Sequence, residues 1–358
     1  MSRIPTPETI DADWLTEVLR AAGHPGVAVS AFRSRQIGTG QIGKCVRFEL
    51  ELDGAGAGVP RSLVGKFPSD DPVSQAAGVQ LRNYYREVEF YRHLADRLGI
   101  STPRCYYADI VGEGPEFALL LEDMQPAVQG DQLAGCSPEV ARAAVLALVG
   151  LQAPSWCDHD LARFDWLSAG DVQLGAQGRE LYAQLLPGFL ERYRAFLAAD
   201  ELEIISRVAR SPSCPLFQPP GSPFCLEHVD YRLDNLLIDE RVSPPRVTVV
   251  DWQSVKLGKP LNDVAYFLGA GLLPEQRRPV EKDIVREYHR ALLQAGVSGF
   301  GWDECWEAYR QGSFAGFGVT VIASMLVQRT PRGDEMFVAM ARRHSRHALD
   351  LGAGEFLD

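Results

Sequence analysis

Hydrophobic and polar positions alternate along the first third of the chain in a way that predicts strands. Residues 44–52 read KCVRFELEL, with Val46, Phe48, Leu50 and Leu52 at every second position, which is the spacing of a strand with one buried face. Apolar residues recur with helical spacing over 8–22 and over the amphipathic segment 81–98. Further strands are expected over 28–37, 62–67, 104–110 and 116–122.

The rest of the chain has mostly helical spacing. One island of strand-like sequence interrupts it, over 235–239 and 246–252. The pattern therefore predicts an α+β protein in which a strand-rich N-terminal part precedes a longer helical part. Helices are expected near 137–152, 172–198, 200–209, 263–272, 279–294, 303–311, 314–328 and 333–351.

Composition and charge indicate which class of protein this is and in which compartment we expect it. The 358 residues are 46% hydrophobic and 23% charged, which is ordinary for a globular protein. The net charge of −11 disfavours binding to nucleic acid or to an anionic membrane. The seven cysteines form no C-x-x-C motif, and the N-terminus has no apolar core typical of a signal peptide. We therefore expect a soluble, cytoplasmic protein with reduced thiols.

A glycine-rich stretch, GTGQIGKC, lies between the first two predicted strands and admits several interpretations. Gly38, Gly40 and Gly43 match G-x-G-x-x-G, but a dinucleotide-binding loop leads into a helix, whereas a strand pattern follows here. The stretch also approaches a Walker A loop, except that Cys45 stands where Ser or Thr would bind Mg²⁺. A third interpretation is the hairpin that covers nucleotide phosphates in kinases, and a plain turn is the fourth.

A second motif points to phosphoryl transfer. His228-x-Asp230-x-x-x-x-Asn235 is followed, sixteen residues after Asn235, by Asp251 at the end of an apolar strand. This chemistry requires an oriented hydroxyl and metal ions that bridge the phosphates. Asp230 can accept the hydroxyl proton, while Asn235 and Asp251 supply the oxygen ligands that Mg²⁺ prefers. Taken singly, Asp230, Asp234 and Asp239 would be interpreted as loop acids and Asp251 as a strand-end cap. The prediction therefore depends on the order and spacing of the set.

Two other enzyme classes lack their motifs. The sequence contains no G-x-S-x-G, the nucleophile motif of α/β-hydrolases. His228 has no second histidine at metal-ligand spacing. His344 and His347 lie three residues apart on a predicted helix, where they could bind a metal, but a solvated face of arginines and histidines is the interpretation that we favour.

Lys66 is one of five lysines among 36 basic residues, and it lies in the short apolar strand LVGKF. In kinases, a lysine at this place binds the α- and β-phosphates and pairs with a glutamate of the next helix. Glu87 shares a helical stripe with Phe90 and Leu94, so it should point inward, whereas Glu89 should form surface ion pairs. The alternative is that both glutamates are ordinary surface acids.

These motifs together resemble those of the aminoglycoside phosphotransferase-like kinases, in particular the branch with choline kinase-like and ecdysteroid kinase-like proteins. The resemblance is carried by GTGQIG, LVGKF, REVEFYRHL, FALLLEDM, HVDYRLDNLLID, VVDWQ and GKPLNDVAYFL, which cover about residues 33–270. It implies a bilobal, protein-kinase-like fold, with a β-rich N-lobe over 1–124 and a larger, mainly helical C-lobe over 125–358. It also implies ATP and Mg²⁺ as cofactors.

The resemblance implies roles for a linker and for a supporting residue. The linker Leu121, Glu122, Asp123 and Met124 would bind adenine through backbone groups. Asp263, in NDVAYFL, would support the catalytic loop.

Two residues of the predicted catalytic loop differ from those that related kinases usually carry. Val229 stands where the family usually has glycine. Arg232 lies two residues after Asp230, where Ser/Thr protein kinases carry lysine. We hypothesise that Arg232 neutralises charge on the transferred phosphoryl group; a salt bridge to Asp234 or Asp239 is the alternative.

The sequence thus predicts an ATP- and Mg²⁺-dependent kinase that phosphorylates a hydroxyl of a small molecule such as an aminoglycoside, a sterol-like alcohol or a sugar. Asp263 is only the twelfth residue after Asp251, which leaves no room for the activation segment of a protein kinase. The alternatives are a catalytically silent nucleotide-binding scaffold and, on the glycines alone, a dinucleotide-dependent oxidoreductase. The acceptor and the oligomeric state are left open.

Overall fold

The computed structural model describes residues 4–38, 42–54, 58–167, 170 and 172–358. The chain forms two compact units. Unit 1 comprises Met1–Arg97, Thr102–Pro126 and Asp251–Ser254, and unit 2 comprises Leu98–Ser101, Ala127–Val250 and Val255–Asp358. Within the described ranges, no helix is both long enough and apolar enough to cross a membrane.

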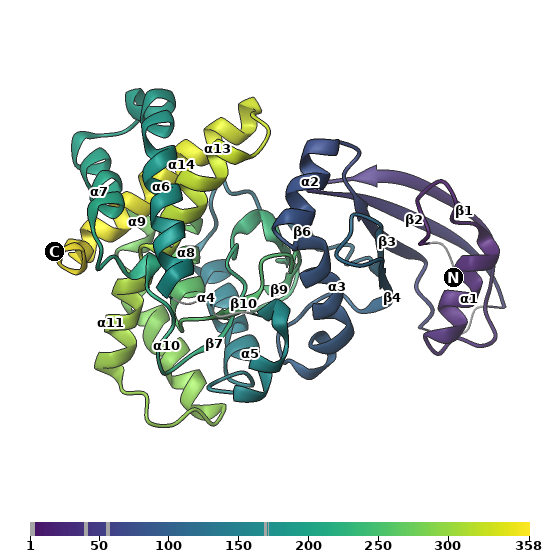
Figure 1. Cartoon of the computed structure of the whole chain (residues 1–358). Coiled ribbons are helices and arrows are strands. Elements are labelled where there is room, and N and C mark those ends of the chain that lie inside the picture. The colour runs from purple at the N-terminus through teal and green to yellow at the C-terminus, as the bar shows by residue number, and fades with distance from the viewer. Residues whose placement is uncertain (1–3, 39–41, 55–57, 168–169, 171) are drawn as a thin grey trace. The chain divides into compact units, whose positions relative to one another are not determined.

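Unit 1 is built on a five-stranded antiparallel sheet of order β1-β2-β3-β5-β4 (Figure 1). The alternation over 44–52 corresponds to β2, in which Val46, Phe48 and Leu50 are buried. The strands are β1 (Ala28–Ile37), β2 (Gly43–Asp53), β3 (Ser62–Pro68), β4 (Cys105–Ile110) and β5 (Phe117–Glu122).

Side chains of β3 alternate between the two faces of this sheet. Leu63 and Phe67 join an apolar core with Leu15 and Leu19 of α1 (Ala12–Ala21). Lys66 belongs to the opposite face because successive side chains of a strand point to opposite sides. There it meets α3 (Asn83–His93).

The predicted helix over 81–98 is shorter than expected and has a neighbour. Helix α2 (Pro72–Gln80) precedes α3, and Arg82, with a φ of 56°, separates the two. Helix α2 has only one buried residue, Gly78, so its sequence carries little of the apolar periodicity that predicts a helix.

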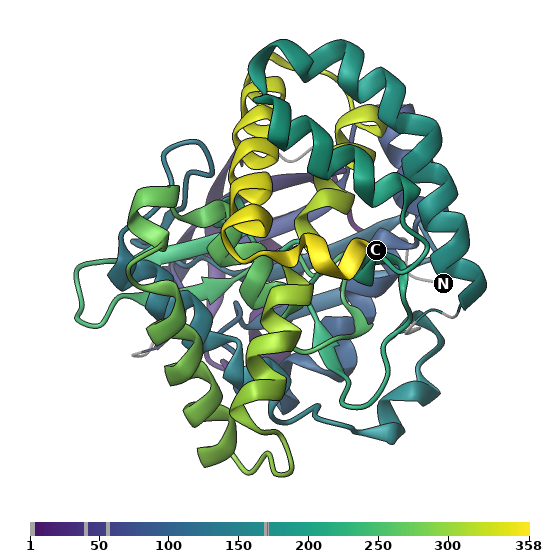
Figure 2. The same cartoon turned by 90° about the vertical axis from the view of Figure 1, so that its left-hand side faces the viewer.

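Unit 2 is mainly helical. Helix α8 runs through its interior, with every residue from Asp263 to Gly271 buried, and α4, α11 and α14 pack against it. Figure 2 shows α6 and α7, in teal, beside the yellow α14. The helices are α4 (Pro138–Ala147), α5 (Val149–Gln152), α6 (Val172–Tyr193), α7 (Ala199–Arg210), α8 (Asn262–Gly271), α9 (Pro274–Arg277), α10 (Glu281–Gln294), α11 (Trp302–Gly312) and α14 (Pro331–Asp350).

Short strands hold the predicted catalytic loop on either side. They are β6 (Val128–Gln129), β7 (Cys225–Glu227), β8 (Leu236–Asp239), β9 (Arg246–Val249) and β10 (Lys256–Gly258). β8 pairs with β6 and β9, and β7 pairs with β10. The predicted strands over 235–239 and 246–252 correspond to β8 and β9. The prediction of an α+β fold, with a β-rich N-terminal part and a mainly helical C-terminal part, is confirmed.

The structure differs from the prediction in two helical regions. The single helix expected over 314–328 is divided into α12 (Ala315–Phe317), a π-helix (Gly318–Ala323) and α13 (Ser324–Leu326). His344 and His347 do not form a solvated face, because both are fully buried. They lie under α8, where a Cβ on Gly269 would approach both Nδ1 atoms closely.

Candidate active site

The glycine-rich stretch connects β1 and β2. Gly38 has a φ of 71°, which glycine adopts without strain. Gly43 is the first residue of β2, and a Cβ there would lie 3.2 Å from Lys66 Cε and from the Phe67 carbonyl oxygen. Gly40 lies outside the described residues. A strand follows this stretch, whereas a dinucleotide-binding loop and a Walker A loop both lead into a helix. The structure therefore excludes both of these interpretations.

Lys66 is held by two carboxylates within unit 1. Its Nζ lies 2.7 Å from Glu87 Oε2 and 2.8 Å from Asp251 Oδ1. Burial alone would lower the pKa of Lys66, but the charges of Asp251 and Glu87 outweigh it and raise this pKa well above its usual value. Lys66 is therefore a fixed cation. Glu89 instead pairs with Arg92 and His93 at the surface.

The linker after β5 combines fixed side chains with an available backbone. Leu121 is buried in β5 between β3 and β4, and the Glu122 N–H donates to the Arg104 carbonyl. Asp123 accepts hydrogen bonds from Arg47 Nη2 at 3.0 Å and from Ser62 Oγ at 2.8 Å. Among the described residues, the N–H and C=O of Met124 have no hydrogen-bond partner, so they could pair with the edge of a planar base.

Asp230 lies in unit 2, where four hydrogen bonds orient its carboxylate. Arg232 Nε donates to both oxygens, at 3.0 and 3.1 Å. Asn235 Nδ2 donates to Oδ2, and the Tyr266 hydroxyl donates to Oδ1, each at 2.9 Å. Burial would raise the pKa of Asp230, but the charges of Arg232 and His228 and the hydrogen bonds lower it below its usual value. The carboxylate thus stays ionised at neutral pH.

Arg232 is itself engaged by two carboxylates. Besides Asp230, its Nη1 donates to Asp234 Oδ2 at 2.8 Å and contacts Met336 Sδ at 3.0 Å. Asp239 instead pairs with Arg241. These contacts match the salt-bridge alternative with Asp234, and a phosphoryl-neutralising role of Arg232 stays a prediction.

Asn235 and Asp251 present oxygen atoms suitable for a hard cation. Both hydrogen atoms of the Asn235 amide are used, by the Asp230 carbonyl and by Asp230 Oδ2. Within the described part of the chain, no hydrogen bond reaches Asn235 Oδ1, so it remains available as a neutral ligand. Asp251 belongs to unit 1, is 26% exposed and already accepts from Lys66. Amide and carboxylate oxygens are the kind of ligand that Mg²⁺ prefers.

Asp263 fixes the backbone before Asp230. Its two carboxylate oxygens accept from the backbone N–H groups of His228 and Val229, at 2.7 and 2.9 Å. Val229 has a φ of 76°, a conformation that is open to glycine but strained for a β-branched residue. The carboxylate of Asp263 therefore stabilises a strained turn at the residue preceding Asp230.

The sequence analysis did not identify three residues of this network, which are Tyr266, Gln132 and Arg332. Tyr266 lies three residues after Asp263 on α8, and this helical spacing could have pointed to it. Gln132 accepts from the Leu233 N–H through its side chain, and its own N–H donates to Asp234 Oδ1, both at 3.0 Å. Asp234 also pairs with Arg332. These long-range contacts leave no signal in the local sequence.

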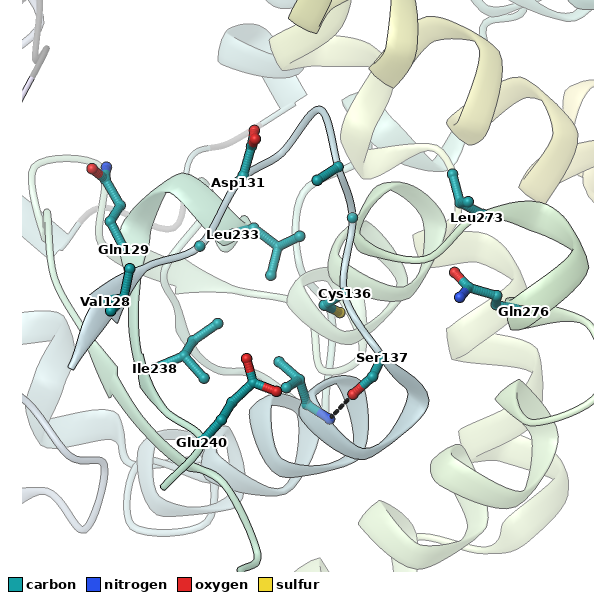
Figure 3. Close-up of a pocket in the computed structure, with 14 residues that line it drawn as sticks. Val128, Gln129, Asp131, Cys136, Ser137, Leu233, Ile238, Glu240, Leu273 and Gln276 are labelled. Carbon is teal, nitrogen blue, oxygen red and sulfur yellow. Dashed lines mark hydrogen bonds between the residues drawn. The ribbon is translucent and has the colours of Figure 1, made fainter. Parts of the chain in front are cut away.

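A pocket of about 360 Å³ adjoins this network in unit 2 (Figure 3). Leu233 and Ile238 form part of its wall, and Asp131 and Glu240 lie on opposite sides of it. Its lining contains neither Asp230 nor Asn235. Within the described ranges, no three His, Cys, Asp or Glu side chains gather as a metal site.

One family model matches more than half of the chain. The model of the phosphotransferase enzyme family (APH) matches residues 55–308. None of the curated proteins matches the chain in sequence.

Solved structures with a similar fold include two kinds of small-molecule kinase. Choline kinase from Cryptosporidium parvum Iowa II is 11% identical, with a TM-score of 0.57 and coverage of 96% of this chain and 95% of that chain. A Ralstonia eutropha protein provisionally assigned as an aminoglycoside phosphotransferase is 15% identical, with a TM-score of 0.52 and coverage of 94% and 98%. The GDP and kanamycin complex of APH(2″)-IIIa is 12% identical, with a TM-score of 0.50 and coverage of 86% and 90%. At these low identities, the structural similarity shows a shared kinase-like fold and nothing more.

Proposed function

The chain belongs to the phosphotransferase enzyme family, and from this premise we propose that it transfers the γ-phosphoryl group of ATP to a hydroxyl of a small molecule. The hydrogen-bonded carboxylate of Asp230 carries the proposal. It is ionised, it is oriented by Arg232, Asn235 and Tyr266, and it follows a backbone turn fixed by Asp263. A carboxylate so fixed can orient a hydroxyl and accept its proton.

Lys66 and the linker would hold the nucleotide. The ammonium group of Lys66 would contact the α- and β-phosphates while Glu87 keeps it oriented. The free backbone groups of Met124 support adenine binding. Gly38, Gly40 and Gly43 would let backbone N–H groups approach the phosphates.

Asn235 and Asp251 would hold Mg²⁺, which when bound offsets the negative charge of the phosphates. The Asn235 amide keeps its oxygen available because both of its hydrogen atoms are bonded to Asp230. Arg232 would add positive charge beside the transferred group. Its two carboxylate partners make it a positioning residue for Asp230 as well.

The acceptor is proposed as a neutral or cationic alcohol of small size. One similar structure is a complex with GDP and kanamycin, and another is a choline kinase. ADP release should therefore be measured over hydroxylated compounds from aminoglycosides and choline to sugars and sterols, with ATP and GTP in parallel.

Asp230→Asn tests the proposal. We expect it to lower kcat at least about 1000-fold, because general-base and orienting effects are lost together, while the Kd for ATP changes less than threefold. Asp13→Asn, at an exposed position of α1, is the matched control and should leave both values unchanged. Turnover by Asp230→Asn at the wild-type rate would refute the assignment. ATP binding by the wild type without turnover of any acceptor would favour a silent scaffold.

A further inference from the structure

Lys259 lines a surface pocket of unit 2 that the proposed reaction does not use. The pocket has a volume of about 300 Å³. Its walls combine apolar side chains with Asn262 and Gln311, and its lining includes the exposed residues Gln218, Gly221 and Glu304. Apolar wall residues include Pro215, Pro219, Pro223, Pro260, Phe300 and Ala308.

The ammonium group of Lys259 is unlike those of the other lysines. Nζ donates to the Pro215 carbonyl oxygen at 2.6 Å. Lys44, Lys66 and Lys256 each lie within 4 Å of a carboxylate, and Lys282 lies over the ring of Trp306. Among the described residues, no carboxylate lies that close to Lys259.

The surroundings of Lys259 weaken its ammonium form relative to the neutral amine. Burial in this pocket lowers the pKa of Lys259 to about 8. Glu227 on β7 and Cys214 oppose this shift, and Lys256 on β10 adds to it. The carboxylate of Glu304, on α11, lines the same pocket at the solvent side. A neutral amine beside a cavity is a nucleophile with room for an electrophile.

We propose that Lys259 is a covalent modification site, at which its Nζ accepts an acyl group from an acyl phosphate or an acyl thioester. The amine nitrogen attacks the carbonyl carbon and forms an amide C–N bond. The C–O or C–S bond of the donor breaks, and phosphate or thiolate leaves with the electron pair. The amine proton passes to solvent. The apolar walls accommodate the short acyl chain, and the ammonium charge is lost.

Competition between the five lysines tests the proposal within one protein. The full chain is incubated at pH 8 with acetyl phosphate or, separately, with acetyl coenzyme A, and acetylation of each lysine is followed by mass spectrometry. At this pH about half of the Lys259 amines would be neutral, against less than about 1% for an ordinary lysine. We expect Lys259 to react at least tenfold faster than the exposed Lys282, because the lower basicity of its amine offsets only part of that gain.

Three further measurements sharpen the result. The rate at Lys259 should be half-maximal near pH 8, and its advantage should vanish in urea. Lys259→Arg should remove the fast phase while leaving acetylation at Lys256 and Lys282 unchanged. The two donors show which source supplies the acyl group. Reaction of Lys259 no faster than Lys282 with both donors would overturn the proposal, whether or not the chain is a kinase.

Discussion

His344 offers a quantitative test of how unit 2 is stabilised. Its ring is fully buried and lies 5.1 Å from the ring of Tyr266, which in turn donates to Asp230. Neither ring nitrogen has a hydrogen-bond partner in the described structure. Burial, together with the nearby charge of His347, lowers the pKa of His344 to about 3. Folding therefore requires this histidine to be neutral.

The contribution of His344 to the free energy of unfolding follows from the difference between its pKa in the folded and in the unfolded state. In the unfolded chain His344 should titrate near about 6.5, so at lower pH the unfolded state binds a proton that the folded state does not. The stabilising contribution is complete above pH 6.5 and is lost as the pH falls towards 3. Between pH 7 and pH 5 the loss from this residue is about 2 kcal/mol, from about 1.4 kcal/mol per pH unit over 1.5 units.

His344→Phe isolates this contribution because no hydrogen bond is broken and the ring is kept. The free energy of unfolding is measured from urea transitions at pH 7 and pH 5 for both proteins. The variant should lose about 2 kcal/mol less than the wild type over this interval. His159→Gln, at an exposed position, should behave as the wild type. Equal losses for His344→Phe and wild type would refute the reasoning.

Two further substitutions test the residues around the proposed nucleotide and catalytic loop. Glu87→Gln should raise the KM for ATP about tenfold and lower the free energy of unfolding by about 2 kcal/mol, because it removes a buried partner of Lys66. Glu89→Gln on the same helix weakens only the ion pairs with Arg92 and His93. In kinetic assays it should leave the KM for ATP unchanged, and in urea unfolding it should cost no more than about 1 kcal/mol. Val229→Gly should raise the free energy of unfolding by up to about 1 kcal/mol, because relief of the strained φ exceeds the entropy cost of glycine, and a lower melting temperature would contradict this account.

The local pattern predicted the parts of the fold that have a regular period. The alternation around Phe48 predicted β2. The pairing of Lys66 with a helix glutamate was expected from the kinase arrangement, and the helical stripe through Phe90 correctly selected Glu87. Short strands such as β7 and β10 were missed, since each has three residues and depends on a partner about thirty residues away. The π-helix around Thr320 was missed because its residues are uniformly apolar or small.

The candidate site was likewise predicted where it depends on local motifs and missed where it depends on long-range packing. The spacing of Asp230, Asn235 and Asp251 was visible because each belongs to a motif with fixed offsets. The hydrogen bond from Tyr266 and the burial of His344 were not visible, since both depend on how α8 and α14 pack. Burial of a histidine without partners cannot be inferred from helical spacing alone.

The discontinuity of unit 1 has a consequence for synthesis on the ribosome. Residues 251–254 belong to this unit. Trp252 stacks on Phe90 at 3.9 Å and donates from Nε1 to Thr102 Oγ1, while Asp251 neutralises Lys66. Domains usually fold as they emerge during translation, but here unit 1 lacks the stacking partner of Phe90 and the second carboxylate of Lys66 until more than two thirds of the chain has been made. Until then Phe90 lacks its stacking partner, so the core of unit 1 is incomplete. We expect a fragment that ends at residue 126 to depend on chaperones to remain in solution.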